Sequence, residues 1–272
     1  MEGLPRAWRE SIVVPVFKKK GDALECGNYR GIKLICHTMK MFERLVDKWL
    51  KEVVEISNDQ FGFVPGRSTI DPIFIVRQMM EKYREKGKEI HIAFLDLGKA
   101  YDRLPIAVLW DVVREPLVSE HLIRLVQDMY DGSAAFVRTS IGDTSSFVAV
   151  TGLHQGLALS PFLFIVVVDT VTQQLLEEPP FSLLYAEDIA LLADTRNQLQ
   201  RKVQMGQDTL AKASLKPNVK KTEFLSTGRD VEPITDVNGV AILQVNKFRY
   251  LGNILSEDGS VDMAVQETIT SA

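Results

Sequence analysis

Apolar segments separated by polar turns predict strands and helices in alternation along the chain. Short apolar runs between turn residues predict strands, and these lie at residues 12–17, 90–97, 222–225 and 248–255. Longer segments with apolar residues every three or four positions, or with a cap before such a run, predict helices. These lie at residues 38–54, 73–86, 119–131, 160–176 and 196–213, with a short helix after Pro105.

The helix predicted over residues 38–54 has a regular apolar face. Met41, Leu45, Trp49 and Val53 recur every four residues, so they share one side of the helix. We expect this side to be the buried one.

Boundary residues mark two further helices. Asp71 is the expected N-cap of the helix that follows it, Pro72 occupies its first turn, and Gly87 ends it. Ser160-Pro161 opens a helix that is expected to be buried and to reach about Leu176.

Antiparallel hairpins are predicted between some of these elements. Residues 134–141 and 147–151 are apolar segments around Gly142-Asp143, which is a turn signal. Hairpins within a series of interleaved strands and helices predict an α+β fold or, as an alternative, an α/β fold.

Composition indicates a globular chain. Its 272 residues are 46% apolar and 25% charged, with no repeat or low-complexity tract, which is enough for one large domain or two modest ones. No signal peptide is evident, and the longest apolar run, Phe162–Val168, is too short to cross a bilayer. Cys26 and Cys36 form no Cys-x-x-Cys motif and the four histidines are scattered, so reduced thiols are expected and a zinc site is not.

The net charge of −4 is unfavourable for a nucleic-acid enzyme, because contacts to phosphate need Lys and Arg. Basic residues are concentrated in two segments, however. Residues 1–51 have 11 basic and 6 acidic side chains, and residues 196–228 have 7 and 2, so each has a local net charge of +5. Basic regions on both sides of an acidic centre suit a nucleic-acid backbone, although solvated charged faces would give the same counts.

The most informative polar feature is a pair of acids at the tip of a predicted hairpin. Tyr185-Ala186-Glu187-Asp188 lies between the apolar segments 182–184 and 189–193, and a third acid, Asp96, follows the apolar run 91–95. If these strands are neighbours, three carboxylates meet at one edge of a sheet and repel one another unless divalent cations bind. Mg²⁺ suits carboxylate ligands, and two Mg²⁺ ions are the common arrangement for nucleotidyl transfer.

A solvated turn is the simpler interpretation of this tetrapeptide alone, because Asp tolerates turn geometry. A metal phosphodiesterase unrelated to polymerases would need a cluster of His and Asp, which the sequence lacks. The choice between a turn and a metal site therefore depends on the other segments of the chain.

Seven segments in order resemble the motifs of reverse transcriptases from non-LTR (LINE-type) retrotransposons. Three resemble the catalytic motifs, namely AFLDLGKAYD at residues 93–102, GLHQGLALSP at 152–161 and YAED at 185–188. Four resemble segments that flank them in this family, namely NYRGI at 28–32, DQFGFVPGRS at 59–68, NVKKTEF at 218–224 and FRYLG at 248–252. One match could arise by chance, whereas a collinear series of seven identifies the chain as similar to this family.

The resemblance implies an α+β fold of the right-hand polymerase type, with an antiparallel palm sheet backed by helices. Residues 1–88 would form the fingers, truncated at the N-terminus, and residues 89–256 the palm. Residues 257–272 would begin a thumb that is largely missing.

The resemblance also implies a metal site. Asp96, Glu187, Asp188 and the backbone carbonyl of Leu97 would hold two Mg²⁺ ions, or Mn²⁺ in their place.

A nucleotide site is implied as well. Arg30 and one of the lysines Lys18–Lys20 would hold the triphosphate, as Arg forks and Lys point charges do. Tyr101 would select deoxynucleotides by steric exclusion of a 2′-hydroxyl. A core aromatic ring is the alternative for Tyr101, and solvated charges are the alternative for the basic residues, more strongly for the lysines.

Further residues would act on the template, the leaving group and the primer. Gln155 and Gly156 would pack against nucleotide and template, since Gly permits close backbone approach. Lys221 would lie near the triphosphate and act as general acid to pyrophosphate, with an ordinary loop charge as the equal alternative. The residues that would grip the primer end are Phe248, Tyr250, Leu251 and Gly252.

Three positions depart from the family pattern. Glu187 stands in place of Asp, and its extra methylene moves the carboxylate by about an ångström, which can cost about a hundredfold in rate. Glu still supplies a hard oxygen donor. Gly98 stands where an acid is frequent, and Ser214 where a glycine is usual.

The expected function is RNA-directed DNA synthesis, in which a primer 3′-hydroxyl attacks the α-phosphate of a deoxynucleoside triphosphate. The expected partners are an RNA template, a DNA primer and dNTPs, with neither a membrane nor an obligate protein partner. An intracellular location, nuclear or cytoplasmic or both, is expected rather than secretion. The alternative is a decayed or repurposed remnant that folds and binds nucleic acid without catalysis, for which Glu187, the shortened ends and the acidic balance argue.

Overall fold

The computed structural model shows two compact units, each built from two separate stretches of the chain. Unit 1 comprises residues 1–55 and 101–167, and unit 2 comprises residues 56–100 and 168–272. The assignment of three consecutive segments to fingers, palm and thumb stays a prediction. The structure describes residues 4–98, 100–114, 118–148, 152–154, 156–176, 182–218, 221–228 and 232–260.

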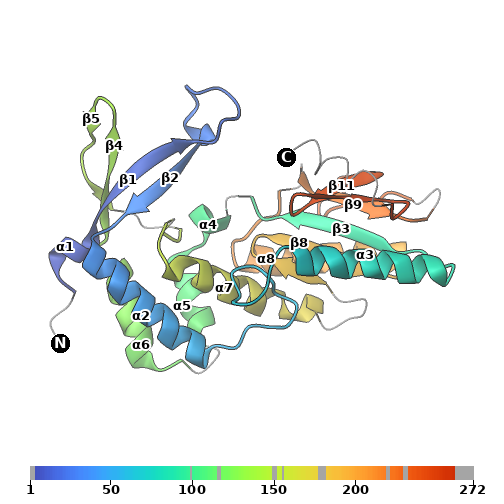
Figure 1. The fold of residues 1–272 in the computed structure, drawn as a ribbon, viewed down its shortest axis with the longest axis horizontal. Coiled ribbons are helices and arrows are strands. Elements are labelled where there is room, and N and C mark those ends of the chain that lie inside the picture. Colours follow the sequence, from blue (N-terminus) through green and yellow to red (C-terminus); the bar gives the residue numbers. More distant parts are fainter. Residues whose placement is uncertain are drawn as a thin grey trace. The chain divides into compact units, whose positions relative to one another are not determined.

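Unit 1 contains a mixed sheet and several helices (Figure 1). Strand β1 (Glu10–Phe17) pairs antiparallel with β2 (Tyr29–Leu34) and parallel with β4 (Ala134–Thr139). The short strands β5 (Gly142–Asp143) and β6 (Phe147–Val148) pair with β4. The helical elements are α1 (Arg6–Arg9), η1 (Cys26–Asn28), α2 (His37–Val53), α4 (Ala100–Arg103), α5 (Ile106–Arg114), α6 (Glu120–Tyr130) and the first half of α7 (Leu159–Leu176).

Helix α2 does not bury the face that its sequence predicted. Met41 is 73% exposed, and the other members of its stripe are exposed as well. The buried residues are Met39, Glu43, Val46 and Leu50, which are spaced by four, three and four positions. This spacing follows the 3.6-residue turn, whereas a strict four-residue repeat drifts around the helix.

The hairpin predicted around Gly142-Asp143 has its turn two residues earlier. Gly142 and Asp143 pair with Thr139 and Arg138 and so belong to a strand. Arg138 donates two hydrogen bonds to the Asp143 carboxylate, each of 3.0 Å, and this bidentate pair fixes the register. The predicted antiparallel pairing of the two segments is confirmed, because β6 pairs with β4. Only the position of the turn was wrong, because Gly-Asp is also compatible with a strand that begins just after a turn.

Helix α7 is apolar and largely buried, as predicted. Its length and composition would be sufficient to cross a membrane, but 67% of the helix is buried inside the protein. Burial of this kind is typical of a core helix in a globular domain.

Unit 2 is built on a five-stranded sheet with the order β10-β9-β3-β8-β7. All neighbours are antiparallel except β10 and β9. The strands are β3 (His91–Asp96), β7 (Leu183–Tyr185), β8 (Asp188–Ala193), β9 (Glu223–Ser226) and β10 (Leu243–Gln244). The predicted antiparallel sheet backed by helices is therefore confirmed, with one parallel edge pair.

Opposite faces of this sheet pack against different elements. Ile92 and Phe94 of β3 share a core with Val76 and Met80 of α3 (Ile70–Glu85). On the other face, helix α8 (Arg196–Lys212) contacts β3 and β8. Both faces are covered, so β3 and β8 read as continuous apolar runs.

Helix α3 begins differently from the prediction. Its N-cap is Thr69, and Asp71 lies inside the first turn, where its carboxylate accepts a 2.6 Å hydrogen bond from the Ser68 backbone N–H. An acid in the first turn favours the helix through the same exposed N–H groups as a cap would. Pro72 occupies the first turn and Gly87, with φ of 61°, follows the end, as predicted.

The segment predicted as a single strand over 248–255 is a hairpin. Strands β11 (Lys247–Tyr250) and β12 (Asn253–Ser256) pair across the two-residue loop Leu251-Gly252. Both loop residues have positive φ, 48° and 84°, as a type I′ turn requires. The hairpin packs on β3, because the Phe248 and Phe94 rings stack with centroids 3.8 Å apart.

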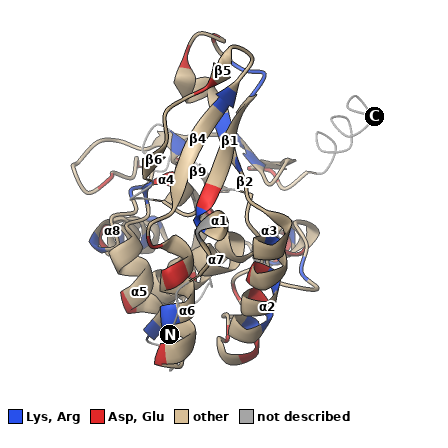
Figure 2. Ribbon diagram, turned by 90° about the vertical axis from the view of Figure 1, so that its left-hand side faces the viewer, with Lys and Arg blue, Asp and Glu red and all other residues tan. Residues whose placement is uncertain are grey.

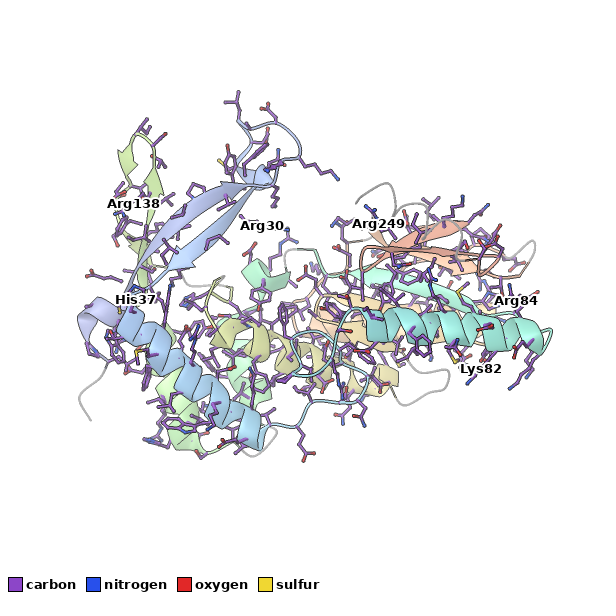
Figure 3. All side chains as sticks on the ribbon, viewed as in Figure 1. Arg30, His37, Lys82, Arg84, Arg138 and Arg249 are labelled. Carbon is purple, nitrogen blue, oxygen red and sulfur yellow. The ribbon has the colours of Figure 1, made fainter. Side chains whose placement is uncertain are left out.

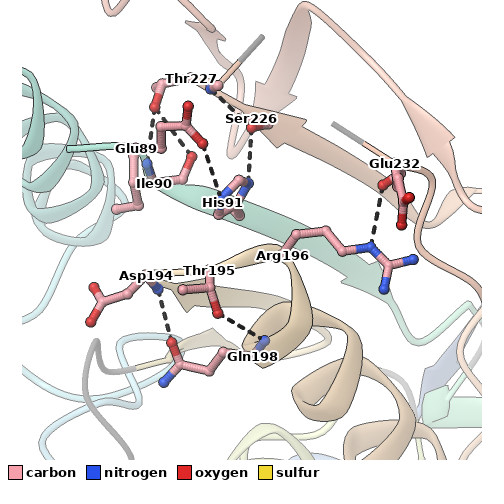
Figure 4. Close-up of polar contacts among 11 residues, drawn as sticks. Glu89, Ile90, His91, Asp194, Thr195, Arg196, Gln198, Ser226, Thr227 and Glu232 are labelled. Carbon is pink, nitrogen blue, oxygen red and sulfur yellow. Dashed lines mark hydrogen bonds and ion pairs between the residues drawn. The ribbon is translucent and has the colours of Figure 1, made fainter. Parts of the chain in front are cut away.

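A polar ladder joins β3 to β9 at the end opposite Asp96 (Figure 4). His91 Nδ1 lies 2.9 Å from the Ser226 hydroxyl, and the Ile90 backbone N–H donates to Thr227 Oγ1 over 2.9 Å. Burial lowers the pKa of His91, so the ring is neutral at physiological pH. This histidine therefore has a structural role in joining β3 to β9.

Candidate active site

The three predicted acids lie at one end of the sheet in unit 2. Asp96, the last residue of β3, is the direct cross-strand partner of Asp188, the first residue of β8. Direct partners in an antiparallel pair have Cα atoms about 4.5–5.5 Å apart and project to the same face. Glu187 immediately precedes Asp188, and its backbone carbonyl accepts a 3.1 Å hydrogen bond from the Leu97 N–H.

The turn that presents these acids is tight. Tyr185 pairs with Asp188, which leaves Ala186 and Glu187 as a two-residue loop. Ala186 has φ of 53°, a left-handed conformation that costs a residue with a Cβ about 1–2 kcal/mol. Strain of this kind persists only where surrounding contacts hold it, and it is concentrated at functional sites.

The clustered negative charge changes the proton affinity of Asp188. Burial is the main cause that raises its pKa to about 6, and the charges of Glu187 and Asp96 raise it further. Lys221 acts in the opposite direction. A bound cation would favour the charged form of this half-buried carboxylate, which lies beside two further acids.

Lys221 reaches this cluster from the loop before β9. Its Nζ donates a 2.9 Å hydrogen bond to Asp96 Oδ2, and the Asn218 backbone N–H donates to the Asp96 carbonyl over 2.8 Å. The second carboxylate oxygen, Asp96 Oδ1, is buried and has no hydrogen-bond partner among the described residues. A buried carboxylate oxygen without a donor is a suitable ligand for a cation.

A groove of about 440 Å³ opens beside these residues in unit 2. It brings together two of the predicted acids, the predicted lysine and the whole predicted primer grip. Arg249 also lines it and is labelled in Figure 3. The lining residues are Phe94, Leu95, Asp96, Asp188, Ile189, Lys221, Glu223, Phe248, Arg249, Tyr250, Leu251 and Gly252.

The donor set fits metal ions that are completed by a substrate. Within the described part of the chain, no group of three or more His, Cys, Asp or Glu side chains is gathered closely enough to hold a metal ion alone. Mg²⁺ at phosphoryl-transfer sites is commonly bound by one or two carboxylates together with substrate phosphates and water. The facing pair Asp96 and Asp188 and the free Asp96 Oδ1 meet that requirement.

Apart from Lys221, the residues predicted to bind the nucleotide belong to unit 1. Lys18 Nζ donates to the Gly27 carbonyl over 2.9 Å, and Arg30 is exposed on β2, opposite Val16 (Figure 3). The Tyr101 ring lies 4.7 Å from the Phe164 ring, centroid to centroid. Gln155 lies outside the described residues, and the roles of all these residues stay predictions.

Gly156 is held at a close approach of two backbone segments. It has φ of 96°, and a Cβ at this position would lie 3.1 Å from the Lys33 carbonyl oxygen. Only glycine satisfies both conditions without strain. The close approach that requires glycine here is to β2, and the role of Gly156 at the nucleotide and template stays a prediction.

Two buried polar residues were not identified from the sequence. Gln60 lies next to the acidic turn, and Glu43 is 2% exposed on α2, where its carboxylate accepts a 3.4 Å hydrogen bond from the Ala158 N–H. Burial is the main cause that raises the pKa of Glu43 to about 7 and lowers that of Lys33 to about 8. Glu43 lies on the buried face of α2 with Met39, Val46 and Leu50. Its position among these apolar residues could have revealed a buried acid, but the opposite face was predicted to be buried.

Glu43→Gln is expected to remove a pH dependence of stability. The folded-state pKa of Glu43 is raised from 4.5 to about 7, so the folded state binds the proton more tightly and loses stability as pH rises between these values. The full effect corresponds to about 3 kcal/mol, reduced by the lost attraction to Lys33. Urea unfolding at pH 4.5 and pH 8 should show that the free energy of unfolding of the variant, relative to wild type, is higher at pH 8 than at pH 4.5. The control is Glu52→Gln on the exposed side of α2, and an equal gain there would contradict the expectation.

Comparison with known proteins agrees with the geometry. A protein-family profile described as "Reverse transcriptase (RNA-dependent DNA polymerase)" matches residues 17–255. The "Transposon TX1 uncharacterized 149 kDa protein" of Xenopus laevis is 26% identical over 238 residues, which cover 83% of this chain and 18% of the relative. A "Retrovirus-related Pol polyprotein from type-1 retrotransposable element R2" of Nasonia vitripennis is 23% identical, covering 96% of this chain and 27% of the relative.

A third relative and two solved structures extend the comparison. The "Probable RNA-directed DNA polymerase from transposon BS" of Drosophila melanogaster is 25% identical, covering 93% of this chain and 30% of the relative. Truncated apo telomerase from Candida tropicalis superimposes with a TM-score of 0.64 at 12% identity, over 94% of this chain and 55% of that one. Candida albicans telomerase in complex with a fragment of telomeric RNA gives 0.60 at 13% identity, over 96% of this chain and 48% of that one.

These matches bear on the fold and on the extent of the chain. At 12–13% identity the telomerase structures show the fold alone, and that fold is the fingers and palm of a right-hand polymerase. The chain spans less than a third of the length of the three sequence relatives named above. Their names confirm the resemblance to retrotransposon reverse transcriptases that was drawn from the motifs.

Proposed function

Because the chain belongs to the reverse transcriptase (RNA-dependent DNA polymerase) family, we propose that it extends a DNA primer with deoxynucleotides on an RNA template. The observation that carries this proposal is the register that sets Asp96 opposite Asp188 at the edge of the groove. A family of this kind uses divalent metal ions, and we propose two Mg²⁺ ions held by Asp96, Asp188, Glu187 and the Leu97 carbonyl. When bound, they would activate the primer 3′-hydroxyl and neutralise charge on the phosphates.

The chain's own groups would position the reacting atoms. The carboxylates of Asp96 and Asp188 fix the edge of the sheet at which the α-phosphate would lie. Lys221 would exchange its contact with Asp96 for the triphosphate and donate a proton to the departing pyrophosphate. Positioning and charge stabilisation of this kind supply most of the catalysis in phosphoryl transfer.

The β11–β12 hairpin is proposed to hold the primer end. Its Leu251-Gly252 tip lines the same groove as the two aspartates. Phe248 stacks on Phe94 and the tilted Tyr250 ring also contacts it, which anchors the hairpin to β3, the strand that ends in Asp96. The primer terminus and the acids would therefore both be positioned by β3.

Residues of unit 1 are proposed to bind the incoming nucleotide. Arg30 and Lys18 would hold the triphosphate, Tyr101 would exclude ribonucleotides, and Gln155 with Gly156 would contact the base pair. Support for Tyr101 is its place five residues after Asp96 in the matched family region.

Primer extension on an RNA template tests the proposed function. The purified chain should incorporate dNTPs in the presence of Mg²⁺ or Mn²⁺ and lose this activity with EDTA. Tight binding of the primer–template without incorporation under either cation would instead favour a non-catalytic remnant, for which Glu187 is the specific argument. The net charge of −4 does not decide between the two, because acidic and basic residues are both scattered over the helices (Figure 2).

A further inference from the structure

Residues 57–67, which we call the brace, run along the edge of the acidic hairpin within unit 2. The brace includes residues 59–67 of the segment DQFGFVPGRS, to which neither the fold nor the proposed function has given a role. Its hydrogen bonds with the hairpin are made by backbone atoms and by the buried side chain of Gln60. We infer that Gln60 is a positioning residue that sets the geometry of the catalytic carboxylates, an inference that rests on the proposed function.

Backbone hydrogen bonds attach the brace to β7. The Phe61 N–H donates to the Leu184 carbonyl and the Leu184 N–H donates to the Asp59 carbonyl, each over 2.8 Å. Gln60 and Leu184 form a parallel bridge, so the brace continues the sheet beyond its edge strand. An edge strand that is paired in this way cannot slip in register without breaking both ladders.

The Gln60 side chain reaches from the brace to the strained residue of the turn. Its Oε1 accepts hydrogen bonds from the Ala186 N–H over 3.0 Å and from the Gly62 N–H over 2.8 Å. Because both partners are N–H donors, the oxygen must face them and the orientation of the amide is settled. Gln60 is fully buried, and Ala186 is 5% exposed, so no water can replace this acceptor easily.

Close packing leaves the turn little freedom to move. A Cβ at residue 62 would collide with the backbone nitrogen of Ala186 and would lie 3.0 Å from the Tyr185 carbonyl carbon. Glycine is therefore required at position 62 by the proximity of the turn. The hydrogen bond from Ala186 fixes the left-handed residue that immediately precedes Glu187 and Asp188.

The other side of the brace is fixed as well. The Arg67 guanidinium donates to the carbonyls of Ser57 and Asn58 over 3.0 and 2.9 Å, and also to that of Gln60. Asp169 of α7 accepts hydrogen bonds from the Ser57 N–H and hydroxyl. A chain of contacts thus connects a core helix to the acidic turn, as outer residues that orient metal ligands commonly do.

Gln60→Met tests the inference, because Met has a similar volume and removes the acceptor. Gln198→Met is the matched control, since Gln198 Oε1 accepts from the Asp194 N–H over 2.9 Å just beyond the opposite end of β8. The first readout is backbone amide hydrogen exchange without metal. We expect exchange at Ala186 to accelerate at least about tenfold in Gln60→Met and to stay unchanged in Gln198→Met.

The second readout is Mn²⁺ affinity measured by electron paramagnetic resonance. Mn²⁺ bound at the acidic site is identified by its loss in Asp188→Asn. We expect the affinity for this Mn²⁺ to weaken about 10–100-fold in Gln60→Met and to be unaffected in Gln198→Met. Ala186→Gly removes the cost of the left-handed conformation. Added to Gln60→Met, it should partly restore the Mn²⁺ affinity. A general loss of stability in Gln60→Met would lower its melting temperature and accelerate exchange along all of β8, whereas loss of positioning confines the acceleration to the turn.

Two results overturn the inference. One is unchanged exchange at Ala186 in Gln60→Met, and the other is accelerated exchange with unchanged Mn²⁺ affinity. Failure of the proposed function is a different outcome, in which the Asp188→Asn variant binds Mn²⁺ as tightly as the wild type does. The exchange measurement does not depend on metal or catalysis, so the two failures are distinguished.

Discussion

Asp96→Ala is expected to abolish templated primer extension, with a loss of more than about 100-fold. Loss of a group that only orients a metal ligand already costs about 10–100-fold, and Asp96 is proposed as a ligand itself. The substitution removes one of the two facing carboxylates and leaves Lys221 without its 2.9 Å partner. The first change removes a ligand of the cations that would neutralise the phosphates, and the freed Lys221 supplies only one positive charge in their place. Single-turnover extension on an RNA template with Mg²⁺ measures the effect.

A matched control separates this effect from misfolding. Asp111→Ala on α5 removes a carboxylate whose side chain is 82% exposed and should leave extension unchanged. Asp96 ends its strand, with only one oxygen buried without a partner, so the melting temperature of Asp96→Ala should stay near that of wild type. Extension that survives Asp96→Ala in a folded protein would remove this residue from the catalytic site.

The acidic site was predictable because its residues stand at the ends of apolar runs. The apolar runs before Asp96 and after Asp188 are each long enough to define a buried strand, and pairing of such strands brings their ends together. An arrangement of this type needs only two buried strands and a two-residue turn. The assignment of Lys221 to the same site depended on the family resemblance, and the structure places its Nζ 2.9 Å from Asp96.

Other features could not be predicted because their causes lie in tertiary contacts. The β11–β12 hairpin turns at Leu251, whose left-handed conformation is not signalled by a leucine. The buried face of α2 includes Glu43, so a search for apolar residues alone selects the exposed stripe. Gln60 acquires its role only when a turn more than a hundred positions away is placed beside it.

Glu187→Asp is expected to increase primer extension by about 10–100-fold. The extra methylene of Glu187 displaces its carboxylate by about an ångström, and a displacement of that size can cost about a hundredfold in rate. The backbone of residue 187 is fixed, because its carbonyl accepts from the Leu97 N–H and the preceding Ala186 is held by Gln60. The side chain therefore cannot compensate by a shift of the turn, and shortening it should return the carboxylate to the position that the family uses.

The reciprocal change gives the matched control for this prediction. Asp188→Glu lengthens the neighbouring acid in the same turn and should lower extension, although the number of carboxylates is unchanged. Asp188 is the more buried of the two, with a pKa raised to about 6 mainly by burial, so a longer side chain there has less room than at the exposed position 187. Opposite responses of the two variants would show that carboxylate placement, rather than charge, limits the reaction. No gain in Glu187→Asp from an inactive wild type would place the defect elsewhere in the chain and favour the non-catalytic remnant.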